Sequence, residues 1–218
     1  MRRILALVVL VLAGSIGNAQ ATTITFEDLA IDDGAITGGD RTSGGFFFDS
    51  ATDHTHIVQN ASSWNTGNGT HFMLIDDVGG THPPVTDAIT FSPTLGSAFT
   101  LTSIDISEAH SNAFFSARQI EVTGNLFGGG TIFTILALDN NLVNGVPGNY
   151  FQTFAFDAGW GNLSSVKLSG VGALGGGNYY AIDNVVVGSA ASVPEPGTLS
   201  LLGLGSAYLI RRRRRNGR

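Results

Sequence analysis

Apolar and polar residues alternate in short runs through the middle of the chain, and glycine, asparagine, aspartate and serine separate these runs. Alternation with a period of two is typical of β-strands, and the separating residues favour turns. No stretch keeps helical periodicity for more than two turns. The pattern predicts an all-β domain, and the number of short antiparallel strands favours a β-sandwich of the jelly-roll type. The eleven runs are Thr23–Phe26, Gly45–Asp49, His54–Gln59, His71–Ile75, Ala88–Phe91, Phe99–Ile106, Arg118–Val122, Thr131–Leu138, Tyr150–Phe156, Ser165–Leu168 and Tyr179–Val187.

The sixth of these runs changes its alternation part-way along. Phe99 and Leu101 fall on one face of an ideal strand, whereas Ile104 and Ile106 fall on the other. An extra residue in the strand, a β-bulge, would return all four side chains to one face. We therefore expect a bulge near Thr102-Ser103.

The start of the chain has the pattern of a secretory signal peptide. Two arginines precede ten consecutive apolar residues, Ile4–Ala13. Ten residues are too few to span a membrane but suit the apolar region of a signal. Ala19 and Ala21 then form the small-x-small pattern that signal peptidase accepts. We predict that residues 1–21 are a signal peptide cleaved after Ala21; a buried N-terminal helix is the alternative.

The end of the chain has three parts in order, after a small-residue linker at 189–192. Two prolines keep the first part extended and open to a protease. A helix over 197–210 would rise about 21 Å, and a hydrocarbon core about 30 Å thick makes it a marginal permanent anchor. The arginine cluster would stop transfer and stay in the cytoplasm, which leaves the preceding domain outside. The parts are the motif Pro194, Glu195, Pro196, Gly197 and Thr198, the apolar run Leu199–Ile210, and the cluster Arg211, Arg212, Arg213, Arg214 and Arg215.

These three parts resemble the PEP-CTERM sorting domain, over Val193–Arg218. The resemblance implies recognition by an exosortase, an integral-membrane protease of Gram-negative bacteria, with cleavage near Pro194-Glu195-Pro196. It also implies a precursor that is anchored only transiently, and a mature form at the cell surface or secreted, in species that make exopolysaccharide and biofilm. A plain single-span transmembrane anchor is the alternative interpretation.

The region between the two ends is strongly acidic. Residues 22–192 contain three basic residues, Arg41, Arg118 and Lys167, and sixteen acidic ones, a formal charge of −13. Such a domain repels nucleic acid and anionic lipid, and it can attract cations. The chain has no cysteine, which excludes disulfides, thiol nucleophiles and cysteine-ligated metals. We place one β-sandwich domain at 22–188.

Three carboxylates are candidates for a calcium site. Glu27 and Asp28 end the first strand of the mature chain, and Asp183 lies in the last. The first and last strands of a jelly roll often lie close together, and Ca²⁺ prefers oxygen ligands. The sequence therefore predicts calcium as a candidate cofactor, with ordinary solvated acids as the alternative. The pairs Asp32-Asp33 and Asp76-Asp77 are interpreted as turn acids.

Two histidines and two tryptophans are further candidates. His54 and His56 share one face of a strand, so they could bind zinc or copper with His71 or His82, although two solvated histidines explain the string as well. Trp64 and Trp160 lie in turn-like contexts, where an exposed ring could stack on a sugar. The alternative for each tryptophan is that it caps the core.

One glycine-rich string, Gly170–Gly175, matches a dinucleotide-binding fingerprint by spacing alone. Phosphate binding needs a helix after the glycines, and a strand follows here, so the string is interpreted as a turn. The run Leu163–Ser169, this turn and the strand Tyr180–Val187 together resemble galactose-binding-like and carbohydrate-binding jelly rolls. No hydrolase, zincin or kinase motif occurs.

The sequence as a whole favours an exported, exosortase-processed protein of the cell surface or extracellular matrix. Its β-sandwich is interpreted as a non-catalytic module that binds exopolysaccharide or another matrix component. Two alternatives stay open, a structural or adhesive protein without a sugar site and a hydrolase of matrix glycans.

Overall fold

A computed structural model describes the β-rich part of the chain, within the compact unit Ala19–Ala190. The signal-peptide segment and the sorting tail lie outside the described residues. No helix in the described part is of the length and apolar character that a membrane crossing requires. The described residues are 20–32, 39–51, 55–59, 66–76, 88–109, 114–141, 150–175 and 177–189.

All eleven predicted strands are present, with small changes at their ends. A twelfth, the three-residue strand β2, was not predicted because Arg-Thr-Ser has no apolar alternation. A single turn of 3₁₀ helix, η1 (Ala158–Trp160), follows β10. The strands are β1 (Ala21–Ile24), β2 (Arg41–Ser43), β3 (Phe46–Ser50), β4 (Thr55–Val58), β5 (Phe72–Ile75), β6 (Ala88–Pro93), β7 (Phe99–Glu108), β8 (Gln119–Leu126), β9 (Thr131–Ala137), β10 (Gln152–Ala155), β11 (Leu163–Val171) and β12 (Tyr180–Ser189).

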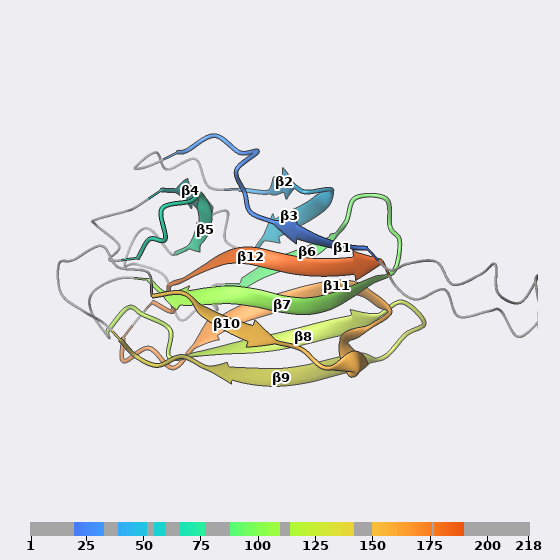
Figure 1. Ribbon diagram of the computed structural model, residues 1–218. Coiled ribbons are helices and arrows are strands. Elements are labelled where there is room, and N and C mark those ends of the chain that lie inside the picture. The colour runs from blue at the N-terminus through green and yellow to red at the C-terminus, as the bar shows by residue number, and fades with distance from the viewer. Residues whose placement is uncertain are drawn as a thin grey trace, which may run out of the picture. The chain divides into compact units, whose positions relative to one another are not determined.

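The strands form two antiparallel layers, as predicted for a β-sandwich. One layer has the order β9-β8-β11-β6-β3-β2. In the other layer, β7 lies between β10 and β12. On the side of β12 away from β7, the first residues of β12 pair with β5 and its last residues pair with β1. Figure 1 shows β7 and β12 side by side across the middle, with β9 at the bottom edge beyond β8. One residue pair, Leu163 and Phe99, joins the two layers.

The hydrophobic core fills the space between the two layers. Its largest members include Phe26, Phe48 and Phe91, all with 0% exposed side-chain surface. Phe26 packs edge-on against Phe48 at a ring-centroid distance of 5.2 Å, and Phe48 stacks on Phe91 at 5.5 Å. Burial of an aromatic side chain of this size contributes about 1.5–3 kcal/mol. Alternating side chains from both layers therefore meet in one aromatic-rich core.

The predicted bulge in β7 is confirmed. The register between β7 and β12 shifts twice here: Asn184 and Val185 face only Ile104, and Thr102 is the extra residue between the pairs Val186–Ser103 and Val187–Leu101. Both Leu101 and Ile104 are fully buried, although three positions separate them. The bulge thus keeps the apolar residues of both halves of β7 in the core.

The glycine-rich string is confirmed as a structural feature of the β11–β12 connection. A Cβ atom at Gly170 would lie 2.2 Å from the carbonyl oxygen of Asn178, and one at Gly175 would lie 2.0 Å from the ring of Phe114. Gly172 has a φ of +86°, which L-residues rarely adopt. Close packing and backbone conformation therefore account for these glycines.

Candidate functional site

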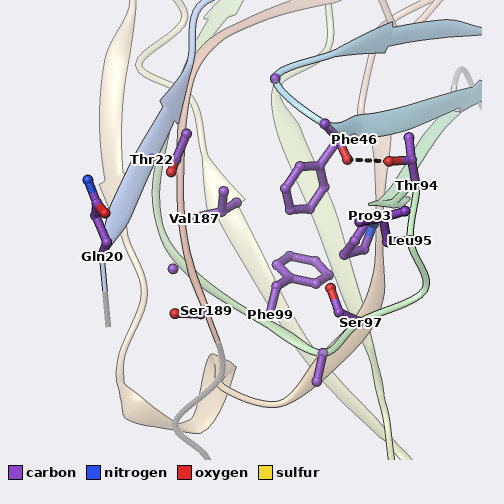
Figure 2. A pocket seen from close by; sticks show the side chains of 14 residues that line it. Gln20, Thr22, Phe46, Pro93, Thr94, Leu95, Ser97, Phe99, Val187 and Ser189 are labelled. Atoms are coloured by element: carbon purple, nitrogen blue, oxygen red, sulfur yellow. Dashed lines mark hydrogen bonds between the residues drawn. The ribbon is translucent and has the colours of Figure 1, made fainter. Parts of the chain in front are cut away.

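An open cavity of about 390 Å³ lies at one end of the sandwich. Strands β1 and β12 form one side, and the ends of β3 and β6 form the other, as Figure 2 shows. Its volume is within the range of small-molecule sites, about 300–1,000 Å³. The described residues that line it are Gln20, Thr22, Gly44, Gly45, Phe46, Pro93, Thr94, Leu95, Ser97, Ala98, Phe99, Val187, Gly188 and Ser189.

Two phenylalanines form the floor of the cavity. Phe46 begins β3 and Phe99 begins β7, and their rings meet edge to face at a centroid distance of 5.1 Å. Figure 2 shows the two rings close together, with Val187 beside them. Phe46 keeps 8% of its surface exposed and Phe99 2%, so only a small part of the Phe46 ring and almost none of the Phe99 ring face the opening. Leu95 adds an apolar side chain that is 92% exposed at the rim.

Hydrogen bonds between two turns hold one wall of the cavity. The carbonyl oxygen of Gly45, in the β2–β3 turn, accepts bonds from the backbone N–H and the Oγ1 hydroxyl of Thr94, both at 3.0 Å. Gly45 has a φ of +80°, which glycine adopts without strain. The β2–β3 turn and the β6–β7 turn are therefore fixed relative to each other.

The polar side chains at the rim are hydroxyls and one amide. Thr22, Ser97 and Ser189 supply hydroxyls, and Gln20 supplies the amide. Among the described lining residues none has a titratable side chain, although the domain as a whole is acidic. These residues can bind an uncharged, hydroxyl-rich ligand through ring contacts and hydrogen bonds. They supply no general acid or base.

The predicted signal cleavage would change this rim. Ala21 begins β1 and pairs with Gly188, so the strand starts one residue before the predicted mature N-terminus at Thr22. Cleavage after Ala21 would remove Gln20 from the cavity and leave Thr22 on it. Ser189, at the other side, precedes the sorting motif by only a few residues. Both ends of the mature domain are thus expected at this cavity.

The first two predicted calcium ligands, Glu27 and Asp28, accept hydrogen bonds from other groups of the protein. The Glu27 carboxylate accepts a hydrogen bond from the backbone N–H of His71 at 2.8 Å. The Asp28 carboxylate accepts bonds from the Oγ hydroxyl of Ser43 and from the backbone N–H of Gly44. Asp28 therefore closes the β2–β3 hairpin, and it does so away from the contacts of Glu27.

The third predicted ligand, Asp183, is fully buried. Its carboxylate accepts hydrogen bonds from Nδ2 of Asn68 at 2.6 Å, Oγ1 of Thr70 at 3.0 Å and the backbone N–H of Asn184 at 2.7 Å. Burial raises the pKa of Asp183, and these donors partly oppose the shift. Asp183 accepts a hydrogen bond from Thr70, and Glu27 accepts one from the next residue, His71, so both carboxylates contact the same segment. Asp28 contacts the β2–β3 hairpin instead.

Within the described ranges, no three His, Asp or Glu side chains are arranged to hold a metal ion. The calcium site stays a prediction.

The histidine prediction falls partly outside the described residues, which do not include His54 or His82. His56, in β4, is buried and faces the buried carboxylate of Asp76, with Nε2 3.3 Å from Oδ1. Interaction with Asp76 raises the pKa of His56, although burial opposes it. Asp76, interpreted as a turn acid, directly follows β5, and its surface is 0% exposed. His71 lies apart from this pair, with Nδ1 3.1 Å from the carbonyl oxygen of Leu29.

The structure contradicts a sugar platform at Trp160. The side chain is only 4% exposed, and its ring packs against Phe156 at a centroid distance of 4.8 Å. Asp157 caps the short η1 helix by accepting a bond from the backbone N–H of Gly159 at 2.8 Å, which turns Trp160 into the core. The alternative, that Trp160 caps the core at a loop, is confirmed. Trp64 lies outside the described residues.

Sequence reasoning missed the residues that form the cavity. Phe46 and Phe99 are 53 positions apart, and each reads locally as one more apolar residue in a strand. Their strands lie in different layers and are not paired with each other, so only the packing of the two layers brings the rings together, and no local motif marks that contact. The one available signal was the glycine pair before Phe46, which predicts a turn.

The C-terminal segment matches a known sorting signal. Residues 192–215 match the PEP-CTERM protein-sorting motif, and this range includes Pro194–Thr198 and Arg211–Arg215. The chain carries a PEP-CTERM sorting motif. The sequence-based identification is confirmed at nearly the predicted boundaries. A PEP-CTERM motif indicates export, with transient anchoring in the membrane through the C-terminal region. The segment itself lies outside the described residues.

Solved structures similar to this chain include carbohydrate-binding modules and an adhesin domain. CBM29_1, a family 29 carbohydrate-binding module from Piromyces equi, is 7% identical, with a TM-score of 0.44, covering 81% of this chain and 94% of that one. The family 32 module from C. perfringens NanJ, in complex with galactose, is 15% identical, with a TM-score of 0.35 and coverages of 78% and 92%.

The K2 cleaved adhesin domain of Lys-gingipain (Kgp) is 14% identical, with a TM-score of 0.45 and coverages of 78% and 99%. Similarity at this level identifies no ligand for this chain. No curated protein matches the sequence.

Proposed function

We propose that this chain is an exported protein of the cell surface or extracellular matrix whose β-sandwich binds exopolysaccharide without catalysing a reaction. Signal peptidase removes residues 1–21, and an exosortase-like membrane protease cuts near Pro194-Glu195-Pro196. The PEP-CTERM motif at 192–215 supports the second step. The single observation that supports binding is the open cavity with an aromatic floor and an uncharged, hydroxyl-bearing rim.

The chemistry of the cavity favours sugars over other ligands. The C–H face of a pyranose ring packs on aromatic rings, and its hydroxyls exchange hydrogen bonds with serine and threonine side chains, which stay on the rim after cleavage. No side chain among the described lining residues offers a charged ligand a counter-charge. The formal charge of −13 would also repel polyanions. The proposed ligand is therefore an uncharged stretch of a polysaccharide.

Binding of the exported protein to the host's own exopolysaccharide tests this proposal. Affinity electrophoresis through gels with and without the polymer gives the dissociation constant, with and without added Ca²⁺. Phe46→Leu removes the more exposed ring of the floor while keeping an apolar core side chain. We expect a loss of roughly 0.5–1.5 kcal/mol of binding energy, or about 2- to 12-fold in affinity, typical of one aromatic contact.

Phe114→Leu is the matched control, because Phe114 is 48% exposed and does not line the cavity. The control variant should bind as the unaltered protein does. No retardation of the unaltered protein with or without Ca²⁺ would contradict polysaccharide binding. Retardation that Phe114→Leu weakens and Phe46→Leu does not would place the binding site elsewhere on the domain.

The burial of Trp160 favours a second candidate function, a structural or adhesive role without a sugar site. That role predicts retention by other cell-surface proteins and no retardation by any glycan. The same electrophoresis experiment distinguishes the two functions.

A further inference from the structure

Strand β9, at the end of the layer β9-β8-β11-β6-β3-β2, has one edge without a described partner. Within the described residues β9 pairs only with β8, and Figure 1 shows it at the border of the sandwich. Leu138 donates its N–H to the carbonyl oxygen of Arg118, and Leu126 donates to Gly130, which fixes the parity of the ladder. Even-numbered residues of β9 therefore bond to β8. The N–H and C=O groups of the odd-numbered residues, 131 to 137, point to the open edge.

The same odd-numbered residues are the exposed ones. Phe133 is 54% exposed and Ile135 50%, and Thr131 and Ala137 are exposed beside them. No residue in 127–138 is charged and none is proline. Proteins usually protect an edge strand with lysine, proline or short length. The other strands with a single described partner, β1, β2, β4 and β10, have only three or four residues, whereas β9 has seven.

We infer that β9 is a homodimerisation edge, which pairs antiparallel with β9 of a second copy about a two-fold axis at Thr134. In this register every edge-facing residue meets an edge-facing residue, Phe133 opposite Ile135 and Thr131 opposite Ala137. The pairing forms eight backbone hydrogen bonds, two for each of four facing pairs. It also creates two aromatic–β-branched contacts, a favourable class of cross-strand pair.

Charge selects a second copy in this register over other arrangements. The acidic domains repel each other over most of their surface. The two-fold places Asp139, the first acid after β9, opposite Gly129 of the partner. It also leaves Glu121, on β8, at least three strand spacings from its counterpart, about 14 Å or more. That distance exceeds the screening length at physiological salt, about 8 Å. The uncharged edge is therefore where two copies can meet without opposing carboxylates.

The contact is small, so the dimer is expected to be concentration-dependent. One seven-residue strand pair buries less than the roughly 1,200 Å² of a standard stable interface. Sedimentation velocity of the protein, purified as the host exports it, should show reversible dimers between micromolar and millimolar concentration. Added salt should strengthen them, because it screens the repulsion between the acidic domains.

Ile135→Lys should shift the monomer–dimer equilibrium at least tenfold toward monomer, because it sets a solvated charge on the apolar edge. Leu174→Lys is the matched control: Leu174 is 66% exposed and lies in the β11–β12 connection. It adds the same charge to the acidic domain and should leave or slightly increase association. A monomer at all concentrations in the unaltered protein, or equal association of the two variants, would overturn the proposal.

Cysteine cross-linking tests the register, since the chain has no cysteine of its own. Thr134 of one copy faces Thr134 of the other in a non-hydrogen-bonded pair, with Cα atoms about 4.5 Å apart, close enough for a disulfide. Thr134→Cys should therefore give disulfide-linked dimers on mild oxidation. Thr131→Cys should not, because the two copies of residue 131 lie about 20 Å apart. Cross-linking through residue 131 alone would overturn the proposed register.

Discussion

The buried pair of His56 and Asp76 should make the stability of the domain depend on pH. Their nearest atoms lie 3.3 Å apart, and the side chains are 6% and 0% exposed. Neither the imidazole nitrogens nor the carboxylate oxygens have a well-aligned hydrogen-bond partner among the described residues. Asp32 and Arg41, joined in their own ion pair, also act on His56, the first raising its pKa and the second lowering it. The pair thus joins β4 to the end of β5 electrostatically.

Asp76→Asn removes the main counter-charge without changing side-chain volume. Loss of one partner from a buried ion pair typically costs 3–5 kcal/mol. We expect the lower end, about 3 kcal/mol, because Asp32 still attracts the imidazolium. For a domain of this size that loss corresponds to a fall in Tm of about 6–12 °C.

The cost should depend on pH with a defined sign. Asp76 raises the pKa of His56 above its ordinary value of 6.5 in the folded state. The stabilisation is therefore fully present below about pH 6.5 and is lost as pH rises through the folded-state pKa. Above the folded-state pKa the imidazole is neutral, and Asp76→Asn should cost less stability than it does at low pH.

Urea unfolding of the unaltered protein, His56→Gln, Asp76→Asn and the double variant measures the coupling free energy of the pair. The cycle is run at about pH 5.5 and about pH 9, on either side of the ordinary histidine pKa. Asp49→Asn is the matched control, because Asp49 is exposed on β3. The reasoning is refuted if the coupling is the same at both pH values, or if Asp76→Asn costs no more than Asp49→Asn.

Three further predictions follow from the fold and the tail. Gly170→Ala should lower the free energy of unfolding by at least about 2 kcal/mol, the scale of overpacking, because its Cβ would lie 2.2 Å from the carbonyl oxygen of Asn178. Chemical denaturation measures this loss, and an unchanged midpoint would contradict the close approach. Trp160→Ala should cost about 3–5 kcal/mol of stability, yet the folded fraction should bind glycan as the unaltered protein does. Loss of glycan binding by the folded fraction would restore the sugar-platform interpretation. Replacing Arg211–Arg215 with serine should leave the domain folded and disturb tail processing, and unchanged processing on an immunoblot would argue against the stop-transfer role.

The sequence predicted the strands well because their signal is local. Alternation with period two located eleven strands, and a parity change between Leu101 and Ile104 located the bulge in β7. Strand β2 was missed because tertiary contacts hold it: Arg41 pairs with Asp32, and Ser43 donates to Asp28. A strand without apolar alternation gives no periodic signal.

The candidate site was harder to predict, because topology assembles it. The Phe46–Phe99 floor depends on β3 and β7 beginning at the same end of the sandwich. The exposure of Trp160 depends on the direction of a three-residue helix, which sequence context does not specify. The partnership of His56 with Asp76 depends on the register between β4 and β5. Residue type alone therefore could not locate the cavity or the buried histidine–aspartate pair.

Intact-mass measurement of the protein recovered outside the cell tests most directly whether its tail is a removable sorting signal. The account predicts one chain that starts at Thr22 and ends near Pro194-Glu195-Pro196, without Arg211–Arg215. A recovered protein that still ends at Arg218 would contradict it, because the C-terminal segment would then be a permanent part of the molecule.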